Sequence, residues 1–141
     1  MATTIRQGTL ADLDALVAFD HVAGSSRERR NQIEAGLRDS EISVALVGGI
    51  PKGYLLLNHR FFGHPFVELL YVDPDSRRIG LASSLMDHVQ NHLSGSKLFT
   101  STNRSNEPMR ELLHELGFEE SGVIYNLDLG DPELVFLKRL Q

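Results

Sequence analysis

The chain has 141 residues, of which 41% are hydrophobic and 23% are charged, a balance that excludes a disordered protein and fits one domain, residues 1–141, with a hydrophobic core. The formal net charge of −5 gives no general attraction for nucleic acid. The absence of cysteine excludes a disulfide framework, a thiolate zinc site and a cysteine nucleophile.

The sequence shows no membrane or export signal. No apolar run approaches the roughly 20 residues that cross a bilayer. The N-terminal residues lack the basic start and apolar stretch of a signal peptide. We therefore expect a cytoplasmic protein that binds neither nucleic acid nor a membrane.

The first half of the chain predicts two helices and a hairpin. In chain order we expect a strand at Thr3–Gln7, a helix with apolar residues from Leu10 to Phe19, a helix at Arg27–Leu37, and strands at Ile42–Val47 and Tyr54–Leu57. Thr9 and the pair Ser25-Ser26 are suitable N-cap residues for the two helices. The glycine-rich residues 48–53 favour a hairpin turn between the two later strands.

The second half of the chain alternates strands and helices. In chain order we expect a loop at Phe61–Pro65, a strand at Phe66–Val72, a helix at Gly80–Leu93, a strand at Lys97–Thr102, a helix between Asn106 and Gly117, and strands at Ser121–Leu127 and Glu133–Leu140. The helix at Gly80–Leu93 is the clearest, because leucine and valine recur four residues apart. The mixed order predicts an α/β fold with a partly antiparallel sheet covered by helices, and not a doubly wound parallel sheet.

The segment from Val72 to Ala82 carries the chemistry. A strand ends there, Arg77 and Arg78 follow, and a helix begins at Gly80. Unpaired N–H groups and the positive end of the macrodipole favour an anion at a helix start, and small residues let the backbone approach that anion. A pyrophosphate fits this pattern. From these residues alone, an anion site and an ordinary helix start with a solvated arginine pair remain equally open.

The same segment resembles the acetyl-CoA-binding motif of the GNAT superfamily of N-acetyltransferases, Q/R-x-x-G-x-G/A. The matching residues are the strand end Val72-Asp73-Pro74, the motif residues Arg77, Gly80 and Ala82, a downstream helix with Asn106 and Leu116-Gly117-Phe118, and a first helix that starts Thr9-Leu10-Ala11-Asp12. Two motifs at the family's spacing, within a matching order of elements, favour the anion site.

The resemblance implies the GNAT fold, with a mixed, mostly antiparallel central sheet, a splayed strand pair and about four flanking helices. It implies that acetyl-CoA binds as a co-substrate. The pantetheine arm would lie between the strands Phe66–Val72 and Lys97–Thr102, and the pyrophosphate would bind N–H groups of Arg78 to Ser83. The implied cofactor-binding residues are Leu70, Tyr71, Val72, Arg77, Arg78, Ile79, Gly80, Leu81, Ala82, Ser83 and Asn106.

Three residues depart from the family pattern. Ala82 replaces a glycine, and Met109 stands where alanine is usual. A helix tolerates the first change well, and we expect the second to alter packing only. Leu113 stands where many members carry a tyrosine that is assigned as the acid for the leaving thiolate. This chain therefore cannot use that acid.

Glu68 is the candidate base and Tyr125 the candidate acid. Strand alternation places Glu68 on one face with Leu70 and Val72, and a glutamate at about this place is the base in some family members. A carboxylate on a solvated sheet face is the equally open alternative. For Tyr125 the alternative is a packing tyrosine whose hydroxyl reaches the surface.

Five other polar residues suggest lesser roles. Asn58, His59 and His64 would lie in a loop near the acceptor, if the resemblance holds there, and His64 would relay a proton or simply be solvated. His88 and His92 have the spacing of metal ligands on a helix, but no third ligand is evident, so we expect no metal.

The sequence therefore predicts an N-acetyltransferase that moves an acetyl group from acetyl-CoA directly to a primary amine of a small molecule or peptide. The acidic residues Asp128, Asp131 and Glu133 would either attract such a cationic acceptor or form a polar turn. Two alternatives are an acyl-CoA-binding module of the same fold that transfers nothing, and a protein that binds only nucleotide or phosphate. Analogy with relatives that pair through terminal strands suggests a homodimer.

Overall fold

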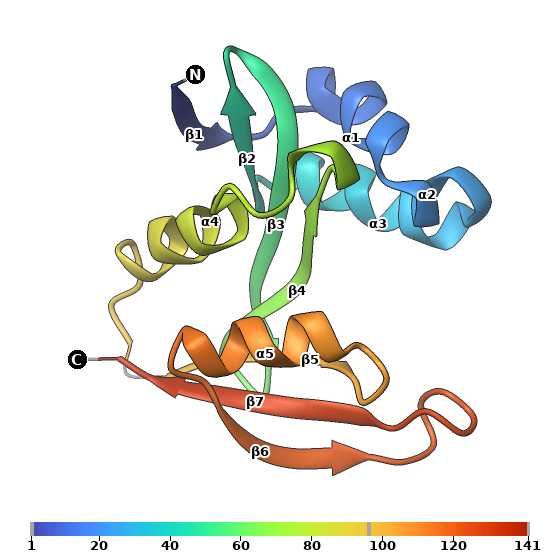
Figure 1. Cartoon of the computed structure of the whole chain (residues 1–141), viewed down its shortest axis with the longest axis vertical. Helices are drawn as coiled ribbons and strands as arrows, with labels where there is room; N and C mark the ends of the chain where they lie inside the picture. The colour runs from blue at the N-terminus through green and yellow to red at the C-terminus, as the bar shows by residue number, and fades with distance from the viewer. Residues whose placement is uncertain (1, 96, 141) are drawn as a thin grey trace. The chain divides into compact units, whose positions relative to one another are not determined.

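The structure is a computed structural model that describes residues 2–95 and 97–140 of the chain (Figure 1). The strands are β1 (Thr3–Gln7), β2 (Ile42–Val47), β3 (Ile50–Phe61), β4 (His64–Val72), β5 (Lys97–Asn103), β6 (Glu119–Ile124) and β7 (Glu133–Arg139). The α-helices are α1 (Leu13–Phe19), α2 (His21–Ser25), α3 (Arg27–Arg38), α4 (Leu81–Gln90) and α5 (Glu107–Glu115). Two 3-10 turns, η1 (Leu10–Asp12) and η2 (Pro74–Ser76), precede α1 and α4.

The strands are hydrogen-bonded in the order β1-β2-β3-β4-β5-β7-β6. The pairs β1–β2, β2–β3, β5–β7 and β6–β7 are antiparallel, whereas β4 and β5 are parallel. Within the described residues, the parallel register is confined to Phe66 opposite Phe99 and Val67 opposite Thr100. The mixed, mostly antiparallel sheet with its helices confirms the expected α/β class.

The described chain divides into two compact units. The first comprises the residues up to Leu57 together with Leu69–His92. The second comprises Asn58–Glu68 and the residues from Leu93 onward. No helix in the described part of the chain is both long enough and apolar enough to span a bilayer.

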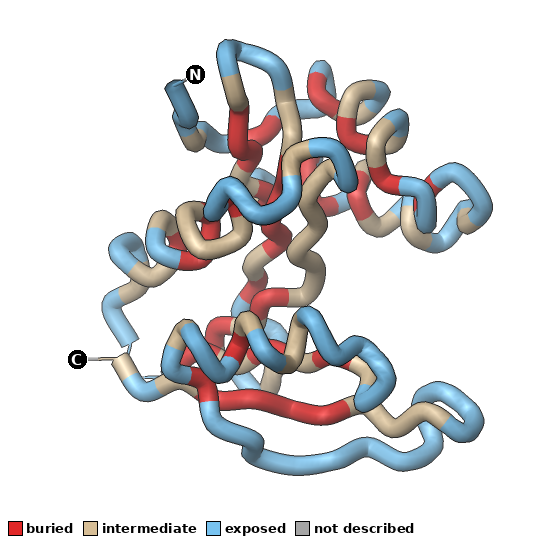
Figure 2. The backbone as a smooth tube through the Cα atoms, viewed as in Figure 1, coloured by how far each residue is buried: buried red, intermediate tan, exposed pale blue. Residues whose placement is uncertain are grey.

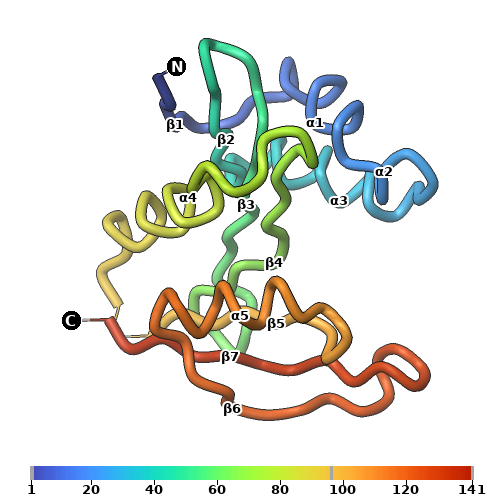
Figure 3. Tube along the Cα trace, viewed as in Figure 1, coloured from blue at the N-terminus to red at the C-terminus, as the bar shows by residue number. Residues whose placement is uncertain are grey.

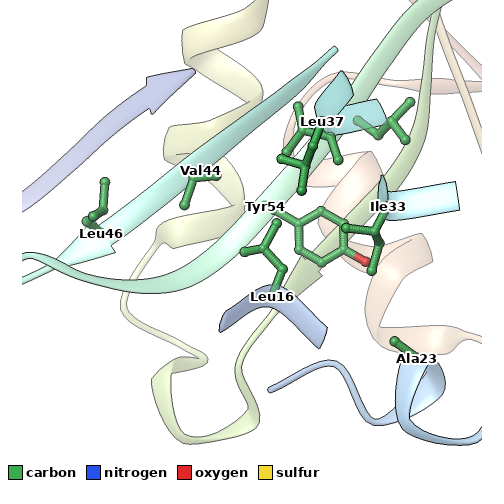
Figure 4. Packing of buried hydrophobic residues seen from close by; sticks show 9 residues of the cluster. Leu16, Ala23, Ile33, Leu37, Val44, Leu46 and Tyr54 are labelled. Atoms are coloured by element: carbon green, nitrogen blue, oxygen red, sulfur yellow. The ribbon is translucent and has the colours of Figure 1, made fainter. Parts of the chain in front are cut away.

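In the first unit, helices cover both faces of the β2–β3 pair (Figure 1). On one face Tyr54 is buried in a cluster that includes Leu16 of α1 and Ile33 of α3 (Figure 4). On the other face, a Cβ atom at Gly53 would lie 3.5 Å from Leu85 of α4. Neighbouring strand residues point to opposite faces. Helix α4, which begins at the predicted anion site, therefore packs on the face opposite α1 and α3.

In the second unit, β7 supplies core residues and β6 lies at the surface. Residues 134–137 of β7 are buried, as are Leu98 of β5, Leu113 of α5 and Phe118. Every residue of β6 is exposed, as the pale blue tube of that strand shows in Figure 2. The last two strands therefore differ sharply in burial although they are paired with each other.

The expected loop at Phe61–Pro65 is wrong. Strands β3 and β4 run directly into a turn made by Phe62 and Gly63, whose φ angles are 52° and 80°. Two successive positive φ angles are typical of a type I′ hairpin turn. Glycine adopts this geometry readily, but phenylalanine does so rarely, so the sequence carries no ordinary turn signal here. Phe61 also stacks on Phe66, with 4.9 Å between ring centroids, and ties the two strands together.

Other element boundaries also differ from the expectation. The short helix α2 was not expected, whereas Ser26 caps α3 as predicted and accepts a hydrogen bond from the Arg29 N–H at 3.2 Å. Helix α4 begins one residue after Gly80, which is its N-cap, and ends at Gln90 rather than Leu93. Strand β6 ends before Tyr125, which the sequence places inside a strand.

Candidate functional site

Figure 3 shows the segment that joins β4 to α4. Asp73 anchors the start of this segment. Its Oδ1 accepts a hydrogen bond from the Asp75 N–H at 3.0 Å, and its Oδ2 lies 3.3 Å from Lys52 Nζ. The N–H of Asp73 donates to the carbonyl of Lys52 at 2.8 Å. Pro74 then opens the 3-10 turn η2. Strand β4 therefore ends at a fixed point, from which the following loop is built.

Two residues with left-handed backbone shape this loop. The φ angle is 69° at Arg78 and 83° at Gly80. For a residue other than glycine, the left-handed conformation costs roughly 1–2 kcal/mol. Both residues are exposed, and a Cβ atom at Gly80 would meet nothing within 4 Å. The loop therefore leaves open space in front of the first turn of α4.

The open helix start favours an anion. The N-cap Gly80 has no side chain with which to accept from the first N–H groups of α4. The positive end of the helix macrodipole lies at the same place. The side chain of Arg78 is exposed, and no ion pair of Arg78 is formed among the described residues. Backbone donors and a free cation together make this a suitable position for a phosphate group.

The side chain of Arg77 contacts the end of β4. Its Nε donates to the carbonyl of Val72 at 3.1 Å, and its guanidinium carbon lies 5.4 Å from the centre of the Tyr71 ring. The cation thus lies over an aromatic face, a favourable contact. Arg77 therefore fastens the loop to the end of β4 with its side chain.

The last residues of β4 alternate between the two faces of the first unit. Tyr71 packs against the core cluster of α1 and α3. A Cβ atom at Gly53 would lie 3.4 Å from Val72 Cγ2, so Val72 points to the α4 face. Leu70 shares the face of Val72 because side chains alternate along a strand. All three residues are partly exposed, as the expected cofactor contacts require.

Glu68 belongs to the second unit, where Asn58 holds its carboxylate. Asn58 is only 2% exposed, and its Nδ2 donates to Glu68 Oε1 at 2.8 Å. The Oδ1 of Asn58 accepts from the Arg60 N–H at 2.9 Å, which fixes the orientation of the amide. Asn58 and His59 lie on β3 and His64 lies on β4, so the expectation that they occupy a loop is wrong. Glu68 is thus a partly buried, oriented carboxylate.

Three further predicted positions lie in the second unit. Tyr125 lies after the end of β6 and is 66% exposed, so its placement on a strand is wrong. Leu113, at the position where the family usually has tyrosine, is 1% exposed and packs in the core. Asn106 caps α5 and accepts a hydrogen bond from the Met109 N–H at 3.3 Å.

Asp128 and Asp131, which precede β7, and Glu133, its first residue, form hydrogen bonds within the second unit. Asp128 accepts from Asn103 Nδ2 at 2.9 Å, and Glu133 accepts from the Ser101 hydroxyl at 2.7 Å. Asp131 accepts from both the N–H and the hydroxyl of Ser105. These contacts favour the polar turn over a site that attracts cations.

His88 and His92 form a pair at the end of α4. Their ring centroids are 4.6 Å apart, and His92 Nδ1 lies 2.7 Å from the carbonyl oxygen of His88. Burial, and secondly the neighbouring His92, lowers the pKa of His88. Across residues 2–95 and 97–140, no group of three or more His, Cys, Asp or Glu residues could hold a metal ion.

A buried polar network in the first unit was missed by the sequence reasoning. Asp20 is completely buried, and its Oδ2 accepts from the Tyr54 hydroxyl at 2.5 Å and from Arg29 at 2.7 Å. Its Oδ1 caps α2 by accepting from the N–H groups of Val22 and Ala23. Burial first, and then the hydrogen bond to Asp20, raises the pKa of Tyr54 far above its usual range. This network ties α2 and α3 to β3.

A second missed contact joins α2 to β4. The Tyr71 hydroxyl lies 2.6 Å from His21 Nδ1, although the two residues are 50 positions apart in the sequence. Phe19 stacks on the Tyr71 ring, with 6.3 Å between centroids. No local spacing could have revealed these partners. Only the capping character of Asp20, an aspartate before a helix, was open to detection.

Comparison with known protein families finds one whose sequence model matches most of the chain. The sequence model of the Acetyltransferase (GNAT) family matches residues 11–118. No curated protein matches the sequence.

Solved structures share the fold along the whole chain. An acetyltransferase of the GNAT family from Bacillus cereus is 33% identical, with a TM-score of 0.91 over 100% of this chain and 99% of that chain. The PaiA N-acetyltransferase from Thermoplasma acidophilum, solved in complex with coenzyme A, is 14% identical, with a TM-score of 0.79 over 99% of both chains. A ribosomal-protein alanine N-acetyltransferase from Escherichia coli is 17% identical, with a TM-score of 0.82 over 99% of this chain and 95% of that chain.

Proposed function

The chain belongs to the GNAT acetyltransferase family, and we propose that it transfers the acetyl group of acetyl-CoA directly to a primary amine of a small molecule or peptide. The observation that carries this proposal is the exposed loop before α4, where Arg78 and Gly80 both have left-handed backbone. Arg78 is strained at an exposed helix start, and its own side chain is a cation without an ion pair among the described residues. Such strain is typical of a ligand site. The coenzyme A bound to the Thermoplasma acidophilum relative supports the same ligand here.

The cofactor would be held mainly by backbone groups. The pyrophosphate would bind the N–H groups from Arg78 to Ser83, with the Arg78 side chain adding a charge-assisted contact. The pantetheine arm would bind backbone groups of Leu70, Tyr71 and Val72, and Asn106 would add a contact from α5. Because most of these contacts use the main chain, substitutions such as Ala82 for glycine are compatible with binding.

The reaction forms a C–N bond and breaks a C–S bond. The neutral amine attacks the thioester carbon, and a backbone N–H near Leu70 or Tyr71 would stabilise the developing oxyanion. Glu68 would accept a proton from the amine nitrogen as the tetrahedral intermediate forms, directly or through water. Its bond to Asn58 holds the carboxylate in one orientation.

The thiolate of coenzyme A then leaves. A thiol has a pKa of about 8.5, so protonation of the thiolate at neutral pH needs little help from the protein. Leu113 is buried and cannot supply a proton. Tyr125 remains the proposed acid only as an auxiliary group, since it is 66% exposed and solvent water can take its place.

Leu113 also favours a second function, an acyl-CoA-binding module that transfers nothing. At that position a leucine, which has no ionisable proton, replaces the family's usual acid. Such a module would bind acetyl-CoA tightly without releasing coenzyme A in the presence of amines. A protein that binds only nucleotide or phosphate would instead bind ADP as tightly as acetyl-CoA.

The proposal is tested by release of free thiol from acetyl-CoA in the presence of spermidine, single amino acids and a peptide with a free N-terminus. We expect turnover with at least one of these amines. Glu68→Gln should lower kcat by about a hundredfold, the usual contribution of a general base. The matched control Glu120→Gln changes an exposed glutamate of β6 and should leave the rate unchanged. Binding of acetyl-CoA with no thiol release would support the module instead.

A further inference from the structure

His88 and His92 form a pair of rings at the C-terminal end of α4, within the first unit. Their ring centroids are 4.6 Å apart, and the ring planes meet at 44°. Residues four apart in a helix are neighbours on the same face. The two imidazoles therefore leave the helix side by side, and their pairing needs no contact with another element.

The backbone that carries the pair is held by hydrogen bonds beyond the end of α4. The N–H of Asn91 donates to the carbonyl of Asp87 at 3.0 Å, and the N–H of His92 donates to the carbonyl of Val89 at 3.1 Å. These bonds continue the helical path as far as His92. The carbonyl of His88 accepts neither N–H group, in keeping with its place at a helix end, where carbonyls lack backbone donors.

The ring of His92 supplies the donor for this carbonyl. Its Nδ1 lies 2.7 Å from the carbonyl oxygen of His88. Because a carbonyl oxygen can only accept, Nδ1 of the neutral ring carries the proton, and the lone pair is on Nε2. Histidines that bind metals are commonly oriented in this way, with one ring N–H on a carbonyl and the other nitrogen directed to the metal.

The separation of the two rings suits a shared metal ion. Zinc lies about 2.0–2.1 Å from a histidine nitrogen and so roughly 3.2 Å from the ring centroid, and an angle of about 90–110° at the metal places two centroids roughly 4.5–5.2 Å apart. The observed 4.6 Å falls within this range. The C-terminal end of a helix also carries partial negative charge, which favours a cation at this position.

We propose that His88 and His92 together bind one divalent transition-metal ion of the zinc type, with water completing its coordination. Imidazole suits zinc, copper and nickel, and two histidines four apart on one helix face are a known zinc-binding arrangement. Within residues 2–95 and 97–140, no third His, Cys, Asp or Glu residue completes a larger group. The expectation of no metal rested on the lack of a third ligand, and a two-histidine surface site does not need one.

The proposed site serves stability and takes no part in the acetyl transfer. The ion links two residues one turn apart, and therefore holds the last turn of α4 in its folded form. Because an ion bound by this pair stabilises only the folded chain, the thermal unfolding temperature should rise with its concentration.

Three variants separate metal binding from helix capping. His88→Gln and His92→Gln each leave a single imidazole at the end of α4. His114→Gln is the matched control, because it removes an exposed histidine of another helix, α5, and leaves the pair intact.

Calorimetric titration of ZnCl₂ into the untagged, EDTA-treated protein is the first measurement. We expect one zinc ion per chain in the wild type and in His114→Gln, and affinity weakened by about tenfold or more in His88→Gln and in His92→Gln, since one of two ligands is lost. Equal zinc affinity in the wild type and in both variants of the pair would place the ion elsewhere. No binding at millimolar zinc would show that the pair is a helix cap only. Either result would overturn the inference.

Nuclear magnetic resonance and thermal unfolding give two further readouts. In protein labelled with ¹⁵N-histidine, ZnCl₂ should shift the ring signals of His88 and His92, leave those of His114 unchanged, and be reversed by EDTA. Zinc should raise the unfolding temperature of the wild type and of His114→Gln, but not that of His88→Gln or His92→Gln. Equal shifts for all three histidines would indicate non-specific binding and contradict the site. Acetyl-CoA enters none of these measurements, so their failure would leave the proposed function untouched.

Discussion

In the first unit, the charged groups around Asp20 are buried and paired, whereas those at the start of α4 are exposed. Around Asp20 every carboxylate oxygen has a partner, and the carboxylate, a phenol and a guanidinium are packed between helices and β3. At the start of α4 the backbone is strained at Arg78, Gly80 is open to solvent, and the nearest free cation has no ion pair among the described residues. The first arrangement serves the fold, and the second leaves interactions available for a ligand.

The largest effect should come from breaking the closed network. Asp20→Ala leaves Arg29 and the Tyr54 hydroxyl buried without their acceptor, so the free energy of unfolding should fall by about 3–5 kcal/mol. Urea unfolding measures this change. The control Asp14→Ala alters an exposed aspartate of α1 and should cost no more than about 0.5 kcal/mol. Equal losses in both variants would show that Asp20 holds no special place in the fold.

A milder change tests how the network shares its energy. Tyr54→Phe removes one donor but leaves Asp20 bonded to Arg29 and to two backbone N–H groups. We expect a loss of about 1–2 kcal/mol in unfolding free energy, the usual cost of one buried hydrogen bond. A loss as large as that of Asp20→Ala would mean that the phenol, and not the carboxylate, organises the network.

A substitution in the open loop before α4 should raise the free energy of unfolding, in contrast to the two substitutions in the Asp20 network. Arg78→Gly relieves the left-handed strain, so we expect a gain of about 1 kcal/mol in unfolding free energy. The same change removes the free cation and loosens the loop, and acetyl-CoA should bind about tenfold more weakly, as expected when a charged hydrogen bond worth roughly 1.5 kcal/mol is lost. Thermal unfolding and calorimetric titration measure the two effects. A variant that is less stable yet binds unchanged would refute the view that strain is stored here for the ligand.

The smallest expected effect is the pH dependence of the stability that Asp12 contributes. The hydrogen bonds from Arg6 hold the pKa of Asp12 below its usual value, burial opposes this, and the Thr9 N–H lowers the pKa further. A carboxylate with a depressed pKa stabilises the fold fully above the unfolded value of about 3.9, and this contribution is lost as pH falls through the lower, folded value. Asp12→Asn should therefore cost about 1 kcal/mol at neutral pH and nothing at the acid end, measured by urea unfolding at both.

The sequence predicts well what depends on neighbours in the chain. The helix at α4, its glycine N-cap and the cap of α3 at Ser26 follow from periodicity and local hydrogen bonding. The exposed loop before α4 followed from the same kind of pattern, whereas its role as an anion site stays a prediction. The hairpin turn at Phe62 and Gly63 was missed because a phenylalanine rarely adopts a positive φ, and because the stack of Phe61 on Phe66 that joins the two strands is not a turn signal.

Contacts between distant elements lie outside such reasoning. Tyr54 lies 34 residues from Asp20 and Tyr71 lies 50 residues from His21, and only folding brings them together. The role of Asn58 as the holder of Glu68 was hidden for a related reason, because the chain between them was taken for a loop rather than a tight hairpin. Tyr125 was predicted to lie on a strand because the apolar sequence continues past Ile124, but β6 ends at that residue.

The central claim is that acetyl-CoA binds at the start of α4, and calorimetric titration of two matched variants tests it most directly. Gly80 and Gly49 have φ angles of 83° and 81°, and a Cβ atom at either would meet nothing within 4 Å. Glutamate therefore introduces the same strain and charge at both. We predict micromolar binding by wild type and by Gly49→Glu, about −8 kcal/mol, and its loss in Gly80→Glu. Equal affinity in the two variants, or no binding by the wild type, would contradict the claim.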